Sequence, residues 1–100
     1  MKVDVRSAVY TAQNYIQSIQ YLMGSIEDLR LEEVELSEDR QFWLVTLGYN
    51  RPVDKTQNLL AELVPSSKFE RDYKIFKIDA ETGDVKAMKI RESVSPNYLA

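Results

Sequence analysis

Residues 73–92, YKIFKIDAETGDVKAMKIRE, decide the fold, because they read as two strands joined by a tight turn. Residues 72–79 (DYKIFKID) form the first strand and carry apolar side chains on both faces, residues 80–83 form the loop AETG, and the chain returns at residue 84. Gly83 supplies the positive φ that a loop of this length requires. The hairpin register then predicts Asp79 opposite Asp84 and Ile78 opposite Val85, with the Asp79 carboxylate accepting backbone N–H bonds.

The same register places lysines opposite each other on both faces of the hairpin. Lys74 is expected to face Lys89, and Lys77 to face Lys86. Directly opposed like charges destabilise a sheet. Two interpretations follow: flexible stems or neighbouring acids relieve the repulsion, or these lysines form a surface for an anionic partner, such as an acidic strand of another subunit.

Upstream, residues 29–50 predict a second hairpin with a polar turn at Ser37–Arg40. This turn would place Val34 opposite Trp43. It would also place Glu32 toward the core, with Glu33 and Glu35 together on the other face. A carboxylate pair can flank a substrate, but two solvated acids that discourage edge pairing are the simpler interpretation.

The N-terminal segment predicts one amphipathic helix over residues 4–23, capped by Asp4 and stopped by Gly24. Its apolar positions recur at spacings of three and four, which places them on one stripe. Tyr10 and Tyr21 flank the stripe and are expected to be exposed. The helix would cover a pocket or a core lined by Ala8, Ala12, Ile16, Trp43 and Val45.

Residues 51–70 connect the hairpins and predict a short helix or a loop that carries Leu59, Leu60 and Leu63. Exposed leucines would need a sheet or a second subunit to cover them.

The predicted elements together form an α+β fold, one N-terminal helix on a four-stranded antiparallel meander. We expect one domain over residues 1–95 and a tail over residues 96–100.

Four segments together resemble the PepSY-like domains: AVYTAQNYI (8–16), LEEVEL (31–36), FWLVTLGYN (42–50) and YKIFKIDAETGDVKAMKI (73–90). The resemblance implies the helix-on-curved-sheet layout of cystatin-like folds. It also implies a binding or inhibitory module, often associated with peptidases, with no catalytic residues to carry over. The Leu-rich connector and the absence of a secretion signal depart from that pattern.

Composition excludes several chemistries. The 100 residues contain no histidine and no cysteine, which removes the commonest general base, the commonest metal ligand and all thiol chemistry. DAETGD (79–84) does not fit a calcium loop, because its glycine stands at the fifth position. A net charge of −3 argues against nucleic acid as a partner. The charge is uneven, with seven acids in residues 27–39 and seven bases in residues 68–91.

These observations predict a cytoplasmic, non-enzymatic module without cofactor or metal, which binds an unknown protein partner or forms a homodimer, and does not bind a membrane. The candidate partner surface comprises Lys74, Lys77, Lys86, Lys89, Leu59, Leu60 and Leu63. The alternative is a small-ligand-binding or enzymatic cystatin-like domain that uses a pocket between helix and sheet.

Overall fold

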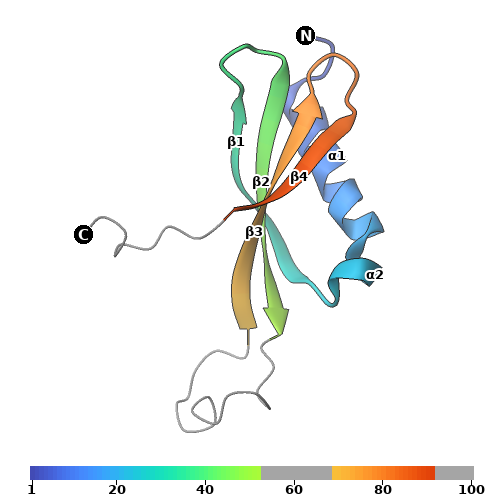
Figure 1. Cartoon of the computed structure of the whole chain (residues 1–100), viewed down its shortest axis with the longest axis vertical. Coiled ribbons are helices and arrows are strands. Elements are labelled where there is room, and N and C mark those ends of the chain that lie inside the picture. The colour runs from blue at the N-terminus through green and yellow to red at the C-terminus, as the bar shows by residue number, and fades with distance from the viewer. Residues whose placement is uncertain (53–68, 92–100) are drawn as a thin grey trace, which may run out of the picture.

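The computed structural model describes residues 1–52 and 69–91, which form a helical layer on one face of an antiparallel sheet (Figure 1). The strands follow the sheet in chain order, β1-β2-β3-β4, as the predicted meander requires. The elements are α1 (Val5–Ser18), α2 (Gln20–Met23), β1 (Glu27–Leu36), β2 (Phe42–Pro52), β3 (Phe69–Asp79) and β4 (Val85–Arg91). The α+β fold class is therefore confirmed.

Helix α1 begins where its sequence predicts, but the single helix expected over residues 4–23 is divided. Asp4 caps α1 by accepting the Ser7 N–H at 2.8 Å. At Ile19 the backbone leaves helical geometry (φ −109°, ψ 8°), and α2 follows as one short turn. Gly24 then ends the helical segment with a φ of 85°, a conformation open mainly to glycine.

The first hairpin has a register different from the predicted one: Val34 lies opposite Val45, and Trp43 lies opposite Leu36. The reason is that the turn lies one residue further along the chain than predicted. Ser37 N–H donates to the Phe42 carbonyl at 2.8 Å, so the loop spans residues 38–41. The Asp39 carboxylate holds this loop, accepting the Ser37 hydroxyl and the Gln41 N–H, and Arg40 takes the positive φ of 62° that glycine would ordinarily supply.

The prediction that Glu32 points toward the core is wrong. A register shift between Leu31 and Glu33 makes Glu32 the extra residue of a β-bulge. Its side chain consequently lies over Gly48, and Leu31 takes the position opposite Leu47. Period-two alternation fails across a bulge, so the residues N-terminal to it change face.

The second hairpin follows the predicted turn and then departs from the predicted register. Ile78 lies opposite Val85, and the Asp79 N–H donates to the Asp84 carbonyl at 2.9 Å. A register shift between Lys77 and Ile78 then leaves Lys86 as the extra residue of a bulge. Because of this shift, every pairing beyond the turn differs by one residue from the expected one.

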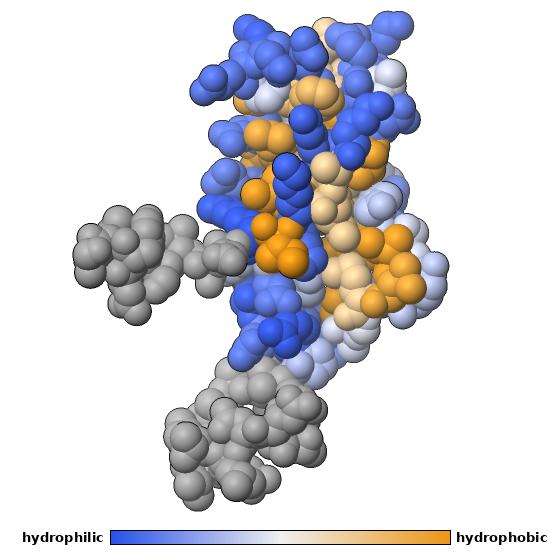
Figure 2. Space-filling model, viewed as in Figure 1, coloured by the Kyte–Doolittle hydropathy of each residue, from blue (hydrophilic) through white to orange (hydrophobic). Residues whose placement is uncertain are grey.

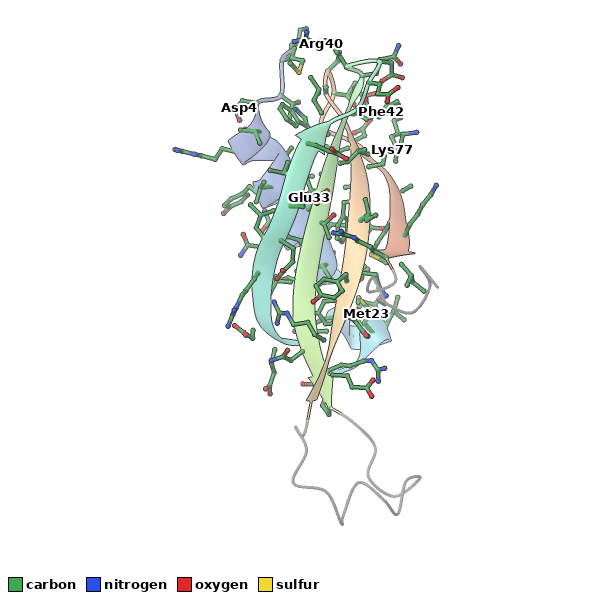
Figure 3. The ribbon with its side chains drawn as sticks, turned by 90° about the vertical axis from the view of Figure 1, so that its left-hand side faces the viewer. Asp4, Met23, Glu33, Arg40, Phe42 and Lys77 are labelled. Atoms are coloured by element: carbon green, nitrogen blue, oxygen red, sulfur yellow. The ribbon has the colours of Figure 1, made fainter. Side chains whose placement is uncertain are left out.

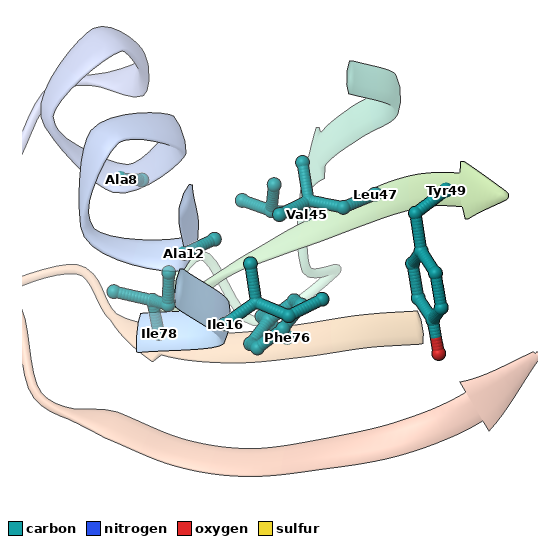
Figure 4. Packing of buried hydrophobic residues seen from close by; sticks show 8 residues of the cluster. All are labelled: Ala8, Ala12, Ile16, Val45, Leu47, Tyr49, Phe76 and Ile78. Atoms are coloured by element: carbon teal, nitrogen blue, oxygen red, sulfur yellow. The ribbon is translucent and has the colours of Figure 1, made fainter. Parts of the chain in front are cut away.

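The core lies between α1 and the central strands β2 and β3 (Figure 4). Phe76 and Ile78 from β3 are completely buried, and the Phe76 ring meets Tyr15 edge to face at a centroid distance of 5.9 Å. The cluster consists of Ala8, Ala12, Ile16, Val45, Leu47, Tyr49, Phe76 and Ile78. The two alanines let α1 approach the sheet closely, and large side chains from the sheet fill the layer.

The connector is shorter than predicted, because β2 continues through Pro52 and β3 begins at Phe69. The short helix considered within residues 51–70, and the boundary between domain and tail near residue 95, fall on residues 53–68 and 92–100, outside the described residues.

Candidate functional site

The four candidate lysines do not form the opposed pairs that the sequence predicted. Lys74 lies opposite Ile90, Lys77 lies opposite Ala87, and Lys89 lies opposite Ile75. The bulge at Lys86 is the physical cause, since it shifts β4 by one residue and removes the like-charge contacts. Lys74 consequently belongs to the face covered by α1, whereas Lys77 and Lys89 belong to the opposite, open face.

Two of these lysines lie near aromatic rings within the sheet. The Lys77 Nζ is 4.2 Å from the centroid of the Phe42 ring, and the Lys74 Nζ is 6.0 Å from that of Tyr49. Such cation–π contacts stabilise a sheet without implying a ligand. The lysines therefore do not form one surface, and Leu59, Leu60 and Leu63 lie outside the described residues.

The open face of the sheet carries both signs of charge (Figure 3). Glu33 and Glu35 of β1 lie opposite Thr46 and Leu44 on this face. Across it, the Arg91 guanidinium of β4 approaches the Glu33 carboxylate to 3.9 Å, and both side chains are partly exposed. Glu33 and Glu35 therefore form an exposed, charged strand edge. Within the part of the chain that the structure describes, they do not line an enclosed pocket in which a substrate could bind.

A polar cluster lies at the other end of the open face. Arg71 donates to the Glu32 carboxylate and to the Asn50 amide oxygen, both at 3.1 Å, and to the Asp28 carbonyl at 3.0 Å. These hydrogen bonds connect β1, β2 and β3, and the polar groups of the cluster satisfy one another as donors and acceptors. We interpret the cluster as structural.

The aspartates of the two turns are bound by the turns themselves. The Asp79 carboxylate accepts the N–H groups of Glu81 and Thr82 at 2.8 and 2.9 Å, and bonds of this kind, chiefly the one from Thr82, lower its pKa. The pKa of Asp39 is lowered by the Ser37 hydroxyl and the Gln41 N–H. Within residues 1–52 and 69–91, no three acidic side chains gather as metal ligands would.

Within residues 1–52 and 69–91, a groove between α1 and β1 forms an apolar concavity. It has a volume of about 330 Å³. Three of its apolar side chains are unusually exposed: Tyr10 at 63%, Leu31 at 47% and Val5 at 42%. The lining residues are Val5, Arg6, Val9, Tyr10, Gln13, Leu31 and Val34. The sequence predicted the exposure of Tyr10, but Leu31 enters the groove only because of the bulge at Glu32.

The groove runs beside the outer edge of β1. β1 is the first strand of the sheet, and no described strand pairs with its outer side. The bond from the Ser37 N–H to the Phe42 carbonyl sets the alternation of the ladder, so Glu35 and Glu33 bond inward to β2. The backbone N–H and C=O groups of Val34 and Leu36 consequently point outward, free for another strand.

A second exposed apolar patch lies on α2, at the lower right of Figure 2. Tyr21 is 79% exposed, as its sequence position predicted, and Leu22 is 72% exposed. A shallow depression beside them is lined by Gln20, Tyr21, Gly24, Ser25 and Ile26. This patch offers no charged group and no strand edge, so it carries less recognition chemistry than the groove.

The space between helix and sheet is filled by packed side chains. Ala8, Ala12, Ile16 and Val45 are completely buried there. Trp43, the fifth residue of the expected pocket lining, packs against them and donates its Nε1–H to the Val3 carbonyl at 2.8 Å. These five side chains therefore act as core.

Comparison with known proteins gives no match to a family model, a curated protein or a solved structure. The site must therefore be interpreted from its own geometry. No helix in residues 1–52 or 69–91 has the length and hydropathy needed to cross a membrane.

Proposed function

We propose that this chain is a non-enzymatic protein-binding module, which holds an extended segment of a partner protein along β1 and in the groove between α1 and β1. The observation that carries the proposal is that an exposed apolar groove lies beside a strand edge with which no described strand pairs. A bound segment would gain main-chain hydrogen bonds from the edge and side-chain contacts from the groove. Both are needed for recognition by strand addition.

The free backbone groups of Val34 and Leu36 supply the main-chain part. A strand added there would place alternate side chains on the helix side of the sheet, next to Leu31 and Tyr10. Tyrosine at such a position favours protein contacts, because it combines a large apolar ring with a polar tip. The remaining side chains of the segment would lie beside Glu33 and Glu35.

The residue inventory supports a binding role over catalysis. A chain without histidine or cysteine has few candidate bases and nucleophiles. The aspartates with lowered pKa values, Asp4, Asp39 and Asp79, are occupied by backbone N–H or hydroxyl groups. The PepSY-like resemblance agrees with a binding role. The absence of cysteine agrees with action in the reducing cytoplasm, which we include in the proposal.

Site-specific photo-crosslinking in the cells that make this protein tests the proposal. A benzophenone amino acid at Tyr10 should capture a partner at the groove, and Leu31→Arg should abolish that adduct by placing a charge in the apolar lining. The matched control places the same probe at Tyr21, which is exposed but lies on α2. Identical adducts from both positions, or an adduct insensitive to Leu31→Arg, would refute a groove-specific partner.

A further inference from the structure

The two outer strands of the sheet carry opposite charges on the same face. On β1, Glu33 and Glu35 lie on the open face, and on β4, Lys89 lies opposite Ile75 on that face with Arg91 two residues further on. No described strand pairs with the outer side of either β1 or β4. The sheet therefore has one acidic edge and one basic edge.

The side chains of β1 and β4 on the face covered by α1 are also compatible with each other, because both strands carry apolar residues there. On β4, Met88 lies opposite Phe76, and Ile90 lies opposite Lys74 with 74% of its surface exposed. On β1, Val34 and Leu31 occupy this face and line the groove. Each edge thus alternates apolar residues on the helix face with charged residues on the open face.

We infer that the segment held by β1 is strand β4 of a second copy of this chain, an inference that rests on the proposed function. β1 and β4 run in opposite directions in the antiparallel meander, so a second copy placed beside the first continues the sheet as an antiparallel pair. Its α1 remains on the same side of the sheet. The helix-covered faces of the two copies therefore lie on one side of the continued sheet, and their open faces lie on the other.

One register satisfies both faces at once. If Val34 lies opposite Ile90 of the second copy, antiparallel counting places Glu35 opposite Lys89 and Glu33 opposite Arg91. Both directly opposed charge pairs are then attractive. The exposed Ile90 side chain is brought to the apolar groove, where contact with Leu31 removes both from water.

The charges disfavour the two symmetric alternatives. Pairing β1 with β1 would bring Glu33 and Glu35 against the same acids, and pairing β4 with β4 would bring Lys89 and Arg91 against the same bases. Like charges across a strand pair are destabilising. The contact is therefore heterologous, and repetition extends it into a chain of copies or a closed ring.

Two structural features limit the strength of the contact. The bulges at Glu32 and Lys86 restrict the regular ladder to Glu33–Leu36 on β1 and to residues 87–91 on β4. Arg91 also approaches Glu33 of its own chain at 3.9 Å, and this exposed ion pair must be shared or exchanged on association. We expect a reversible, salt-sensitive association.

A charge-swap experiment on the full chain tests the pairing. The first variant carries Glu33→Lys and Glu35→Lys, which makes both edges basic, and the second carries Lys89→Glu and Arg91→Glu, which makes both edges acidic. Each variant loses the same internal Arg91–Glu33 pair, so each is the stability control for the other. Far-ultraviolet circular dichroism establishes that both are folded, and sedimentation velocity measures association over a range of concentrations and salt.

The wild-type mass should rise with concentration and fall with added salt. Each variant alone should associate about tenfold more weakly or worse, because two attractive pairs become repulsive. An equimolar mixture of the two should associate again, since basic edges now meet acidic ones. A monomeric wild type, or a mixture that associates no better than its components, overturns the inference. In that case a Tyr10 adduct with a different protein would still support the proposed function, whereas absence of any groove-specific adduct would overturn both.

Discussion

The Glu32 side chain lies close to Gly48, and this closeness leads to a testable prediction about the bulge at Glu32. The sequence alone did not reveal that bulge. A Cβ atom added at Gly48 would stand 2.9 Å from both Cγ and Oε1 of Glu32, and 3.1 Å from its Cδ. Gly48→Ala therefore forces the Glu32 side chain to move away from its present position. That movement breaks the 3.1 Å contact between Glu32 and Arg71.

The magnitude follows from three contributions. Loss of a partly exposed ion pair costs about 0.2–1 kcal/mol, and an unfavourable rotamer costs about 0.5–1.5 kcal/mol. Replacing glycine by alanine in a strand returns about 0.5–1 kcal/mol, because the unfolded chain has less freedom to lose. We expect a net loss in the free energy of unfolding of about 1 kcal/mol for Gly48→Ala.

The sign should reverse when Glu32 is first changed to alanine. In that background the clash and the ion pair are both absent, so Gly48→Ala should stabilise the protein by about 0.5 kcal/mol. The assay is urea unfolding of the wild type, the two single variants and the double variant, followed by the fluorescence of Trp43, the single tryptophan. A coupling energy near zero in this double-mutant cycle would refute the position assigned to Glu32.

Four further perturbations test the fold. Phe76→Ala removes a completely buried ring and should lower the free energy of unfolding by about 3–5 kcal/mol in urea titrations. Gly83→Ala places a side chain at a φ of 81° and should cost about 1–2 kcal/mol, measured in the same way. Trp43→Phe removes the 2.8 Å bond to the Val3 carbonyl and should cost about 0.5–1.5 kcal/mol, followed by circular dichroism. The Thr82 and Glu81 N–H groups hold the pKa of Asp79 below its ordinary value, so its contribution is complete above the unfolded-state pKa and disappears as pH falls through the folded-state pKa. The difference in urea midpoint between wild type and Asp79→Ala should consequently be largest near neutral pH and decrease as the pH falls through the folded-state pKa.

The fold class was predictable because its signals are local. Asp4 caps a helix through its own side chain, and Gly83 permits a turn through its own backbone, so neither depends on distant residues. The alternation through Trp43, Val45 and Leu47 likewise predicts that these residues share one face of the strand, and that face is the one that packs on α1.

The surface was less predictable, because it depends on strand pairing. One bulge turns Glu32 toward the open face and places Leu31 in the groove, and another separates the lysines that regular alternation would set opposite each other. A bulge depends on how two strands fit together, and the sequence of one strand does not reveal it.

The sequence by itself determined the order of elements, the capped start of the N-terminal helix, the turn around Gly83 and the side of β2 that faces the helix. Only the tertiary structure decided which strands lie at the edges, which outward side chains share a face, and how the groove between α1 and β1 forms. The physical reason is the sequence separation of the interacting residues. Helix caps and turns are formed by residues a few positions apart, whereas a surface is made by distant residues that only the sheet brings together. The acidic and basic segments were visible in the sequence, but the meander is what places them on opposite edges of one sheet.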